Sequence, residues 1–153
     1  MHRAALFVLP LVTLAASSGA ALQAQEPNTV QTGTLRVTVT GLHSAQGQLI
    51  ACLWTEKKGF PSCQKSPTAR RLVLPVKATT MQLSFPGVAP GTYAVTVHHD
   101  EDGNGKMKHN FIGMPKEGVG VSNNPGGMPG YSKSLIEVAG DSAIAIRMRY
   151  LFD

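Results

Sequence analysis

The sequence predicts an all-β protein, a single antiparallel β-sandwich of about seven strands with one long loop rich in glycine and Asx residues. Three observations favour this class. Short segments alternate between apolar and polar residues with a period of two, and turns rich in glycine and proline separate them at fairly regular spacing. No long stretch has the periodicity of an amphipathic helix. Many short strands without a helix are typical of a sandwich.

Seven segments carry the strand pattern. They are residues 35–40, 48–54, 71–76, 81–85, 93–97, 133–138 and 143–150. The segment 48–54 is apolar on both faces, which predicts a central strand. Pro75 cannot donate a hydrogen bond to a neighbouring strand, so its segment is expected at a sheet edge. In the segment 93–97, Val95 is assigned to the inner face and Thr96 to the outer face.

The turn before Tyr93 points to a particular kind of sandwich. Pro90-Gly91-Thr92-Tyr93 entering a strand resembles prealbumin-like and surface-protein sandwich domains, so we expect an immunoglobulin-like or prealbumin-like arrangement. Tyr93 either bonds back to the backbone, as the tyrosine of a tyrosine corner does, or is a plain core tyrosine. The sequence leaves both interpretations open.

Residues 1–24 have the pattern of a secretory signal peptide. A positive start precedes an apolar core at residues 4–16, and small residues follow it. The alternative is an uncleaved anchor, but the apolar run is shorter than the roughly 20 residues that span a bilayer. We expect cleavage and export, a flexible leader at 25–32, and one domain at 33–153 that is periplasmic or extracellular.

The charge pattern argues against a nucleic-acid partner. The sequence has 14 basic and 9 acidic residues, and loss of Arg3 with the signal peptide leaves 13 against 9, a net charge of +4. The positive residues are scattered and form no basic stripe with interleaved aromatics. No second apolar segment follows, so no transmembrane segment is expected in the mature chain. The expected partner is an unknown protein, peptide or saccharide of the cell envelope.

The chain contains two cysteines, Cys52 and Cys63. An exported protein meets an oxidising compartment, which favours a disulfide that holds residues 55–69 as a loop. The competing interpretations are two separate buried thiols or a metal site. Two cysteines without a nearby histidine make a poor zinc site, so we expect the disulfide.

The run from His98 to Asn124 breaks the alternation of the strand before it. Two histidines at its start are followed by three carboxylates, Asp100, Glu101 and Asp102, and glycines recur along the rest of the run. A loop this long is uncommon in a compact domain and is usually functional or disordered. The order of its polar residues is specific rather than repetitive, so this loop is where we expect the protein to work.

The same run resembles the signature of a family of small secreted bacterial proteins known only as a domain of unknown function. That signature reads roughly H-D-x-[DN]-x-N-G-K-x-D-x-N-x-x-G-x-P-x-E-G-x-G-x-S-N-N. The matching residues are His99, Asp100, Asp102, Asn104, Gly105, Lys106, Asn110, Gly113, Pro115, Glu117, Gly118, Gly120, Ser122, Asn123 and Asn124. The departure is Lys108, where the family usually has Asp. The resemblance implies kinship and brings no established activity.

Calcium is the first candidate cofactor for the loop. The candidate ligands are the side chains of Asp100, Asp102 and Asn104 and the carbonyl of Lys106, with Gly105 at the turn. This spacing follows a helix–loop–helix calcium loop until the last position, where Phe111 replaces a bidentate Glu. Glu117 or Asn110 could complete the site only if the loop folds back. The alternative is an acidic turn cluster without a metal.

A transition metal is the second candidate. Imidazole suits copper or zinc and thioether suits Cu(I), and the candidate ligands are His98, His99, His109 and Met107, with Met114 and Met128 nearby. Against this assignment, adjacent residues at a strand end point to opposite faces, which separates the first two histidines. The methionines suit gap-filling under a long loop equally well.

A catalytic site is not expected. His99, Asp100 and Ser122 are ingredients of a nucleophilic site, but the segment 120–124 lacks the second glycine of a nucleophile elbow. Hydrogen bonds within the loop could order it without metal. The residues expected in such structuring roles are Gly105, Asn110, Glu117, Ser122, Asn123 and Asn124. The Asp100 side chain is expected to accept hydrogen bonds from the amides of Gly103 and Asn104.

These patterns favour an exported, non-enzymatic binding or assembly module of unknown ligand that presents the Asp100–Asn124 loop, with calcium as the candidate ordering ion. The alternative is a periplasmic copper- or zinc-binding protein that uses the histidines and methionines of the loop.

Overall fold

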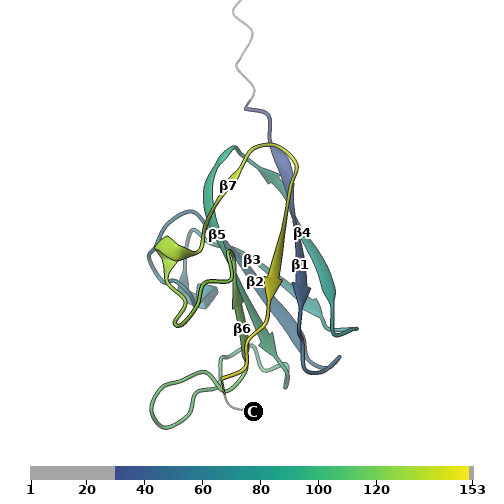
Figure 1. Cartoon of the computed structure of the whole chain (residues 1–153), viewed down its shortest axis with the longest axis vertical. Helices are drawn as coiled ribbons and strands as arrows, with labels where there is room; N and C mark the ends of the chain where they lie inside the picture. Colours follow the sequence, from purple (N-terminus) through teal and green to yellow (C-terminus); the bar gives the residue numbers. More distant parts are fainter. Residues whose placement is uncertain (1–29, 152–153) are drawn as a thin grey trace, which may run out of the picture.

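The computed structural model describes residues 30–151, which form two β-sheets packed face to face (Figure 1). The predicted signal peptide and the leader up to residue 29 lie outside the described residues. The predicted β-sandwich is confirmed, and helix within 30–151 is limited to two 3-10 turns, Cys63–Lys65 and Tyr131–Lys133. In this part of the chain no helix is long and apolar enough to span a membrane.

Eight strands make up the two sheets of the described chain. Their bounds are β1 Gly33–Thr40, β2 Gln48–Trp54, β3 Arg70–Pro75, β4 Met81–Val88, β5 Gly91–Asp100, β6 Gly118–Val121, β7 Leu135–Val138 and β8 Ser142–Arg147. The smaller sheet has the order β4-β1-β8. The larger sheet has the order β3-β2-β5-β6, and β7 pairs with the first half of β5. The pairing of β1 with β8 is parallel, and the other pairings are antiparallel.

The main core lies between the two sheets. The inward side chains of β1, which are Leu35, Val37 and Val39, are fully or almost fully buried and belong to one cluster with Val95 of β5. β2 lies between β3 and β5 with both faces buried, and β3 lies at the sheet edge. The central position predicted for β2 and the edge position predicted from Pro75 are therefore confirmed.

A second, smaller core covers the outer face of the larger sheet. Its buried members are Ile50, Cys52, Trp54, Cys63 and Ala94, and Phe60 and Tyr131 pack against them. The predicted disulfide between Cys52 and Cys63 is present. It fastens the segment between β2 and β3 over this face of the sheet.

Thr96 lies on the outer face of the larger sheet, opposite Val95, as predicted, but it is not exposed to solvent there. Thr96 is only 5 % exposed, and its hydroxyl accepts a hydrogen bond from Nε1 of Trp54 at 2.9 Å. Both faces of the middle of β5 are buried, so a polar residue at this position marks a paired buried hydroxyl rather than a solvent-facing side chain.

The tyrosine-corner interpretation of Tyr93 is confirmed. Its hydroxyl donates to the carbonyl of Ala89, four residues earlier, at 2.9 Å. This bond closes the turn that leads into β5, the strand from which the long loop departs.

The long loop contains one strand that the sequence did not predict. β5 continues to Asp100, and Gly118–Val121 returns beside it as β6. The period-two pattern is hidden because glycines fill alternate positions. A Cβ on Gly118 would lie 2.5 Å from the ring of Tyr150, and one on Gly120 would lie 2.6 Å from Cγ2 of Ile146. β6 therefore needs glycine to pass close to the chain around β8.

Candidate binding site at the Asp100–Asn124 loop

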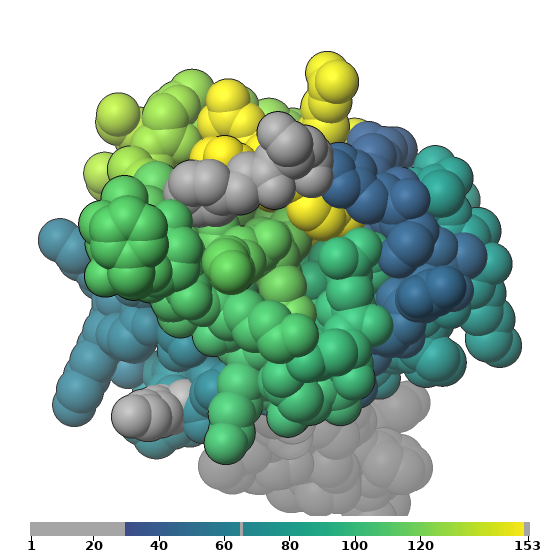
Figure 2. Space-filling model, turned by 90° about the horizontal axis from the view of Figure 1, so that it is seen from below, coloured from purple at the N-terminus to yellow at the C-terminus, as the bar shows by residue number. Residues whose placement is uncertain are grey.

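The Asp100–Asn124 loop leaves β5 at one end of the sandwich. It returns as β6, which pairs antiparallel with β5. It extends beyond the sheets at this end (Figure 1). Seen from that end, its green atoms form much of the left and centre of the surface (Figure 2). The register places His99 opposite Gly118, so both stems of the loop are held by one pair of strands.

Asp100 anchors the start of the loop. Its side chain is completely buried, and Oδ1 accepts the amide of Asn104 at 3.2 Å. Oδ2 accepts the amide of Gly105 at 2.6 Å and Nε2 of Gln48 at 2.7 Å. The amide of Gly103 bonds the backbone carbonyl of Asp100 instead of its side chain. The expected role of Asp100 as an acceptor for the turn is present, with Gly105 in the place foreseen for Gly103.

Glu117 anchors the end of the loop. It is 4 % exposed, and its Oε2 accepts the amide of Lys108 at 3.0 Å. The same oxygen lies 2.9 Å from Nε2 of His98 on β5. Glu117 therefore joins the two limbs of the loop to each other and to the sheet.

The loop folds back far enough to bring three carboxylates together. One oxygen from each of Asp100, Asp102 and Glu117 lies within 4.8 Å of the others. Two of these residues are predicted calcium ligands. The other side-chain ligand, Asn104, uses its Oδ1 to accept the amide of Lys106 at 2.7 Å. Hard cations prefer such oxygen donors, so the cluster has the composition of a calcium site.

The ammonium group of Lys108 contacts this cluster directly. Its Nζ lies 2.6 Å from Oδ2 of Asp102, an oxygen that also accepts Nδ2 of Asn104 at 2.7 Å. The hydrogen bond from Lys108 lowers the pKa of Asp102 to about 2, and the same contact raises the pKa of Lys108. The positive charge of this side chain offsets part of the negative charge that would attract a metal ion.

Asn110 shapes the outermost turn of the loop. Its Oδ1 accepts the amides of Ile112 at 3.1 Å and Met114 at 2.9 Å. Its backbone amide donates to the carbonyl of Met114, and its carbonyl accepts the amide of Gly113. One side chain thus holds a closed turn.

The residues after β6 attach the loop to its neighbours. The Ser122 hydroxyl is buried, accepts the amide of Val95 at 2.9 Å and donates to the carbonyl of Ser134. Nδ2 of Asn123 donates to the carbonyl of Leu135. The Asn124 side chain bonds the β8 backbone in both directions, donating to one carbonyl and accepting one amide. These predicted structuring residues bond to the backbone of neighbouring segments.

His99 lies apart from Ser122 in the hydrogen-bond network. It is completely buried, with Nδ1 2.6 Å from the Tyr150 hydroxyl and Nε2 2.9 Å from the carbonyl of Gln46. His98 faces the other way, toward Glu117. The structure therefore separates the two adjacent histidines, as expected for neighbours on a strand.

A pocket of about 290 Å³ lies between the loop and the outer face of the larger sheet. The disulfide and Val121 belong to its sheet side, and Pro115 and Met107 belong to the loop. The side chain of Gln64, beside the disulfide, donates to the carbonyl of Gly105 and so joins the disulfide segment to the loop. His98, His109, Met107 and Met128 all line this space, whereas His99 does not.

Comparison with protein-family models matches residues 37–146, most of the chain, to the family described as "Uncharacterized protein conserved in bacteria (DUF2141)". The chain belongs to this family. Comparisons with curated proteins and with solved structures returned no match. Membership agrees with the resemblance to a domain of unknown function.

Sequence reasoning missed several residues that build the site in this DUF2141 protein. Gln48 and Gln64 fasten the loop from segments far away in the chain, and Tyr150 holds His99. No local signal identifies such partners, because their contacts depend on strand register. Lys108 could be noticed from the sequence, because the signature of the family usually has Asp at this position.

Proposed function

We propose that this protein is a non-enzymatic binding module whose ligand site is the pocket between the Asp100–Asn124 loop and the outer face of the larger sheet. The observation that supports this is the pocket itself. Ligand sites are concave, largely apolar and few, with a small number of polar groups that orient the ligand. Here the lining is mostly aliphatic, proline, methionine and disulfide, and His98 and Thr96 are among the few polar groups.

The lining favours an apolar ligand group. A saccharide would need several hydrogen-bonding side chains directed into the space, whereas Met107, Val119 and Val121 offer contact area without donors or acceptors. At about 290 Å³, the pocket suits one short hydrocarbon chain or one apolar side chain of a peptide. The ligand we propose is therefore an apolar moiety of an envelope molecule.

The hydrogen bonds of the loop support its role as a wall of this pocket. Asp100 and Glu117 fix its two stems, and Gln64 joins its first turn, at Gly105, to the disulfide segment. A preorganised wall lowers the entropy that is lost on binding. The proposal includes export, which is supported by the signal-like pattern of residues 1–24 and by the disulfide.

The experiment that tests the pocket is a titration with 1-octanol, a neutral probe that cannot bind through charge. Wild-type protein should bind it saturably. Met107→Gln, which puts an amide into the apolar lining, should weaken binding by about ten-fold, the effect of roughly 1.4 kcal/mol. The matched control is the neighbouring change Lys106→Gln, outside the lining, which should leave affinity unchanged. Equal affinity in the two variants would remove the pocket as the binding site.

A second candidate function is binding of copper in the same pocket. It is favoured by one observation, that His98, His109, Met107 and Met128 all line this space. Imidazole with thioether suits Cu(I), and the bond from His98 to Glu117 resembles the outer-shell contacts that orient ligating histidines. A Cu(I) competition titration tests it. His109→Ala should weaken binding, and His99→Ala should affect it only through stability.

We propose that calcium can also bind to the loop. The cluster of Asp100, Asp102 and Glu117 supports it. A cation placed there would have to compete with Lys108 for Asp102 and with backbone amides for Asp100. We therefore propose that calcium binds this chain only weakly.

A further inference from the structure

The tip of the loop exposes two adjacent large apolar side chains. Phe111 is 98 % exposed and Ile112 is 66 % exposed. Neither residue lines the pocket. Single exposed apolar residues are normal on a protein surface, but these two are neighbours at the end of a projecting loop. The fold does not bury these two side chains, so they can contact another surface.

The turn at the tip enforces this exposure. The Asn110 side chain bonds the amides of Ile112 and Met114, and Gly113 adopts a left-handed φ of 81°. Below the turn, His109 and Pro115 form a β-bridge. These bonds fix the backbone on both sides of Phe111 and so hold this residue at the end of the turn.

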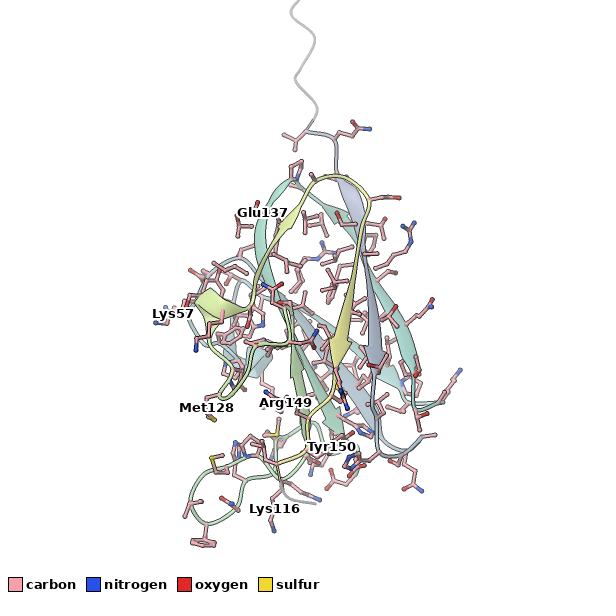
Figure 3. The ribbon with its side chains drawn as sticks, in the orientation of Figure 1. Lys57, Lys116, Met128, Glu137, Arg149 and Tyr150 are labelled. Carbon is pink, nitrogen blue, oxygen red and sulfur yellow. A yellow bond between two sulfur atoms is a disulfide. The ribbon has the colours of Figure 1, made fainter. Side chains whose placement is uncertain are left out.

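The charge around the tip is positive. The segment 103–116 contains Lys106, Lys108 and Lys116 and no carboxylate. Lys108 pairs with Asp102. Lys106 and Lys116 are exposed, and Lys116 lies on the loop at the end of the molecule (Figure 3). A loop with an apolar tip and lysines on its limbs complements a surface that is negatively charged outside and apolar beneath.

We propose that the tip of the loop, formed by Phe111 and Ile112, docks onto the interface of an anionic phospholipid bilayer, and that Lys106 and Lys116 on the limbs of the same loop add electrostatic attraction. Aromatic and aliphatic side chains insert at the boundary of headgroups and acyl chains, and lysines contribute by attraction to anionic lipid. The proposal concerns the tip alone and goes beyond the ligand site in the pocket.

The small size of the tip favours a bilayer over an acidic protein as its partner. A stable protein interface buries about 800 Å² on each side, whereas one aromatic side chain buries about 150–250 Å². Two side chains on one turn fall well below that area. A bilayer needs no complementary shape and accepts a narrow tip, so the observations fit it better.

The test is sedimentation with phosphatidylcholine vesicles, with and without phosphatidylglycerol. Wild-type protein should bind the mixed vesicles and lose most of this binding at high salt. Phe111→Ser should lower the partition coefficient by about ten-fold or more, because the ring no longer leaves water. Phe111→Leu should retain most of the binding. Lys116→Gln should lower it by about five-fold on mixed vesicles only.

The matched control is Val73→Ser, which removes a partly exposed apolar residue from the edge strand β3 and should leave vesicle binding unchanged. Equal binding of wild type and Phe111→Ser, or no binding by wild type, would overturn the proposal; the second result would make an acidic protein the better partner. The pocket proposal is tested separately, because Phe111→Ser should keep 1-octanol binding and Met107→Gln should keep vesicle binding.

Discussion

Gln48 and Asp100 face each other in the ladder between β2 and β5, and their side chains are joined by a hydrogen bond of 2.7 Å from Nε2 to Oδ2. The bond connects the first residue of one central strand with the last residue of the other. Because Oδ2 of Asp100 also accepts the amide of Gly105, a strand end and a loop turn share one buried carboxylate oxygen.

Asp100→Ala should loosen the loop and leave the sandwich folded. The change removes acceptors for the amides of Asn104 and Gly105 and leaves Nε2 of Gln48 without this partner. Hydrogen exchange should accelerate across the loop by about ten-fold or more and stay slow in β1 and β2, since local and global opening are separable. Unchanged hydrogen exchange in the loop would contradict the claim that the Asp100 side chain orders it.

Acidification should break the contact between Asp102 and Lys108 only at low pH. The pKa of Asp102 is about 2, below its ordinary 3.8, because Lys108 bonds its charged form. The contact therefore contributes fully to the stability of the fold at a pH above the ordinary pKa of Asp102. This contribution is lost as the pH falls through the pKa that Asp102 has in the folded protein. The carboxyl carbon of Asp102 should titrate by NMR near 2, and Lys108→Met should move the midpoint toward 3.8. An unmoved midpoint would refute the pair.

Replacing Lys108 with aspartate should create a stronger calcium site. Lys108→Asp removes the ammonium group from Asp102 and adds a carboxylate beside Asp102 and Glu117. Calcium affinity, measured by calorimetry, should rise by about ten-fold or more, because ligand charge tunes such sites. The matched control is Lys106→Asp, which makes the same change of charge two residues away. If both variants gain equally, the effect is net charge and not a site.

Thr96→Val should destabilise the protein although it keeps the size of the side chain. It leaves Nε1 of buried Trp54 without its acceptor, which costs about 1–3 kcal/mol of unfolding free energy. Thr92→Val, which removes an exposed contact with Glu137, should cost less than about 0.5 kcal/mol in the same urea titration.

Val95→Asp should prevent folding, because it buries an unpaired charge in the main core.

Removing the disulfide should lower stability and damage the pocket together. The double change Cys52→Ala and Cys63→Ala should cost about 2–3 kcal/mol in urea, at the low end for small domains because the closed loop is short. It should also weaken 1-octanol binding, since both cysteines line the pocket. Two free thiols in protein taken from its native compartment would contradict the disulfide itself.

The sequence predicted those strands in which the alternation of side chains shows which face of the strand is buried. β1, β2 and the middle of β5 carry branched apolar residues toward the main core, so their positions were readable. β6 was not readable, because Gly118 and Gly120 replace the side chains that would show a period of two. The face of Thr96 was predicted, but its burial was missed because the second core that covers this face leaves no local signal in the sequence of β5.

In the site, local contacts were predictable and distant ones were not. The bonds from Asp100 to the following turn span only four and five residues, within reach of an Asx rule. Its bond to Gln48 spans 52 residues and depends on strand register. The pocket depends on the disulfide segment, the loop and β6 meeting in space, so no single stretch of sequence contains it.

The most direct test of the proposed function is an NMR map of the protein titrated with 1-octanol. The proposal predicts saturable shifts that concentrate at pocket residues such as Ile50, Val119, Val121 and the methyl group of Met107, with β1 and β8 unchanged. Shifts confined to the exposed tip at Phe111 and Ile112, or spread over the surface without saturation, would contradict the claim that this pocket is the ligand site.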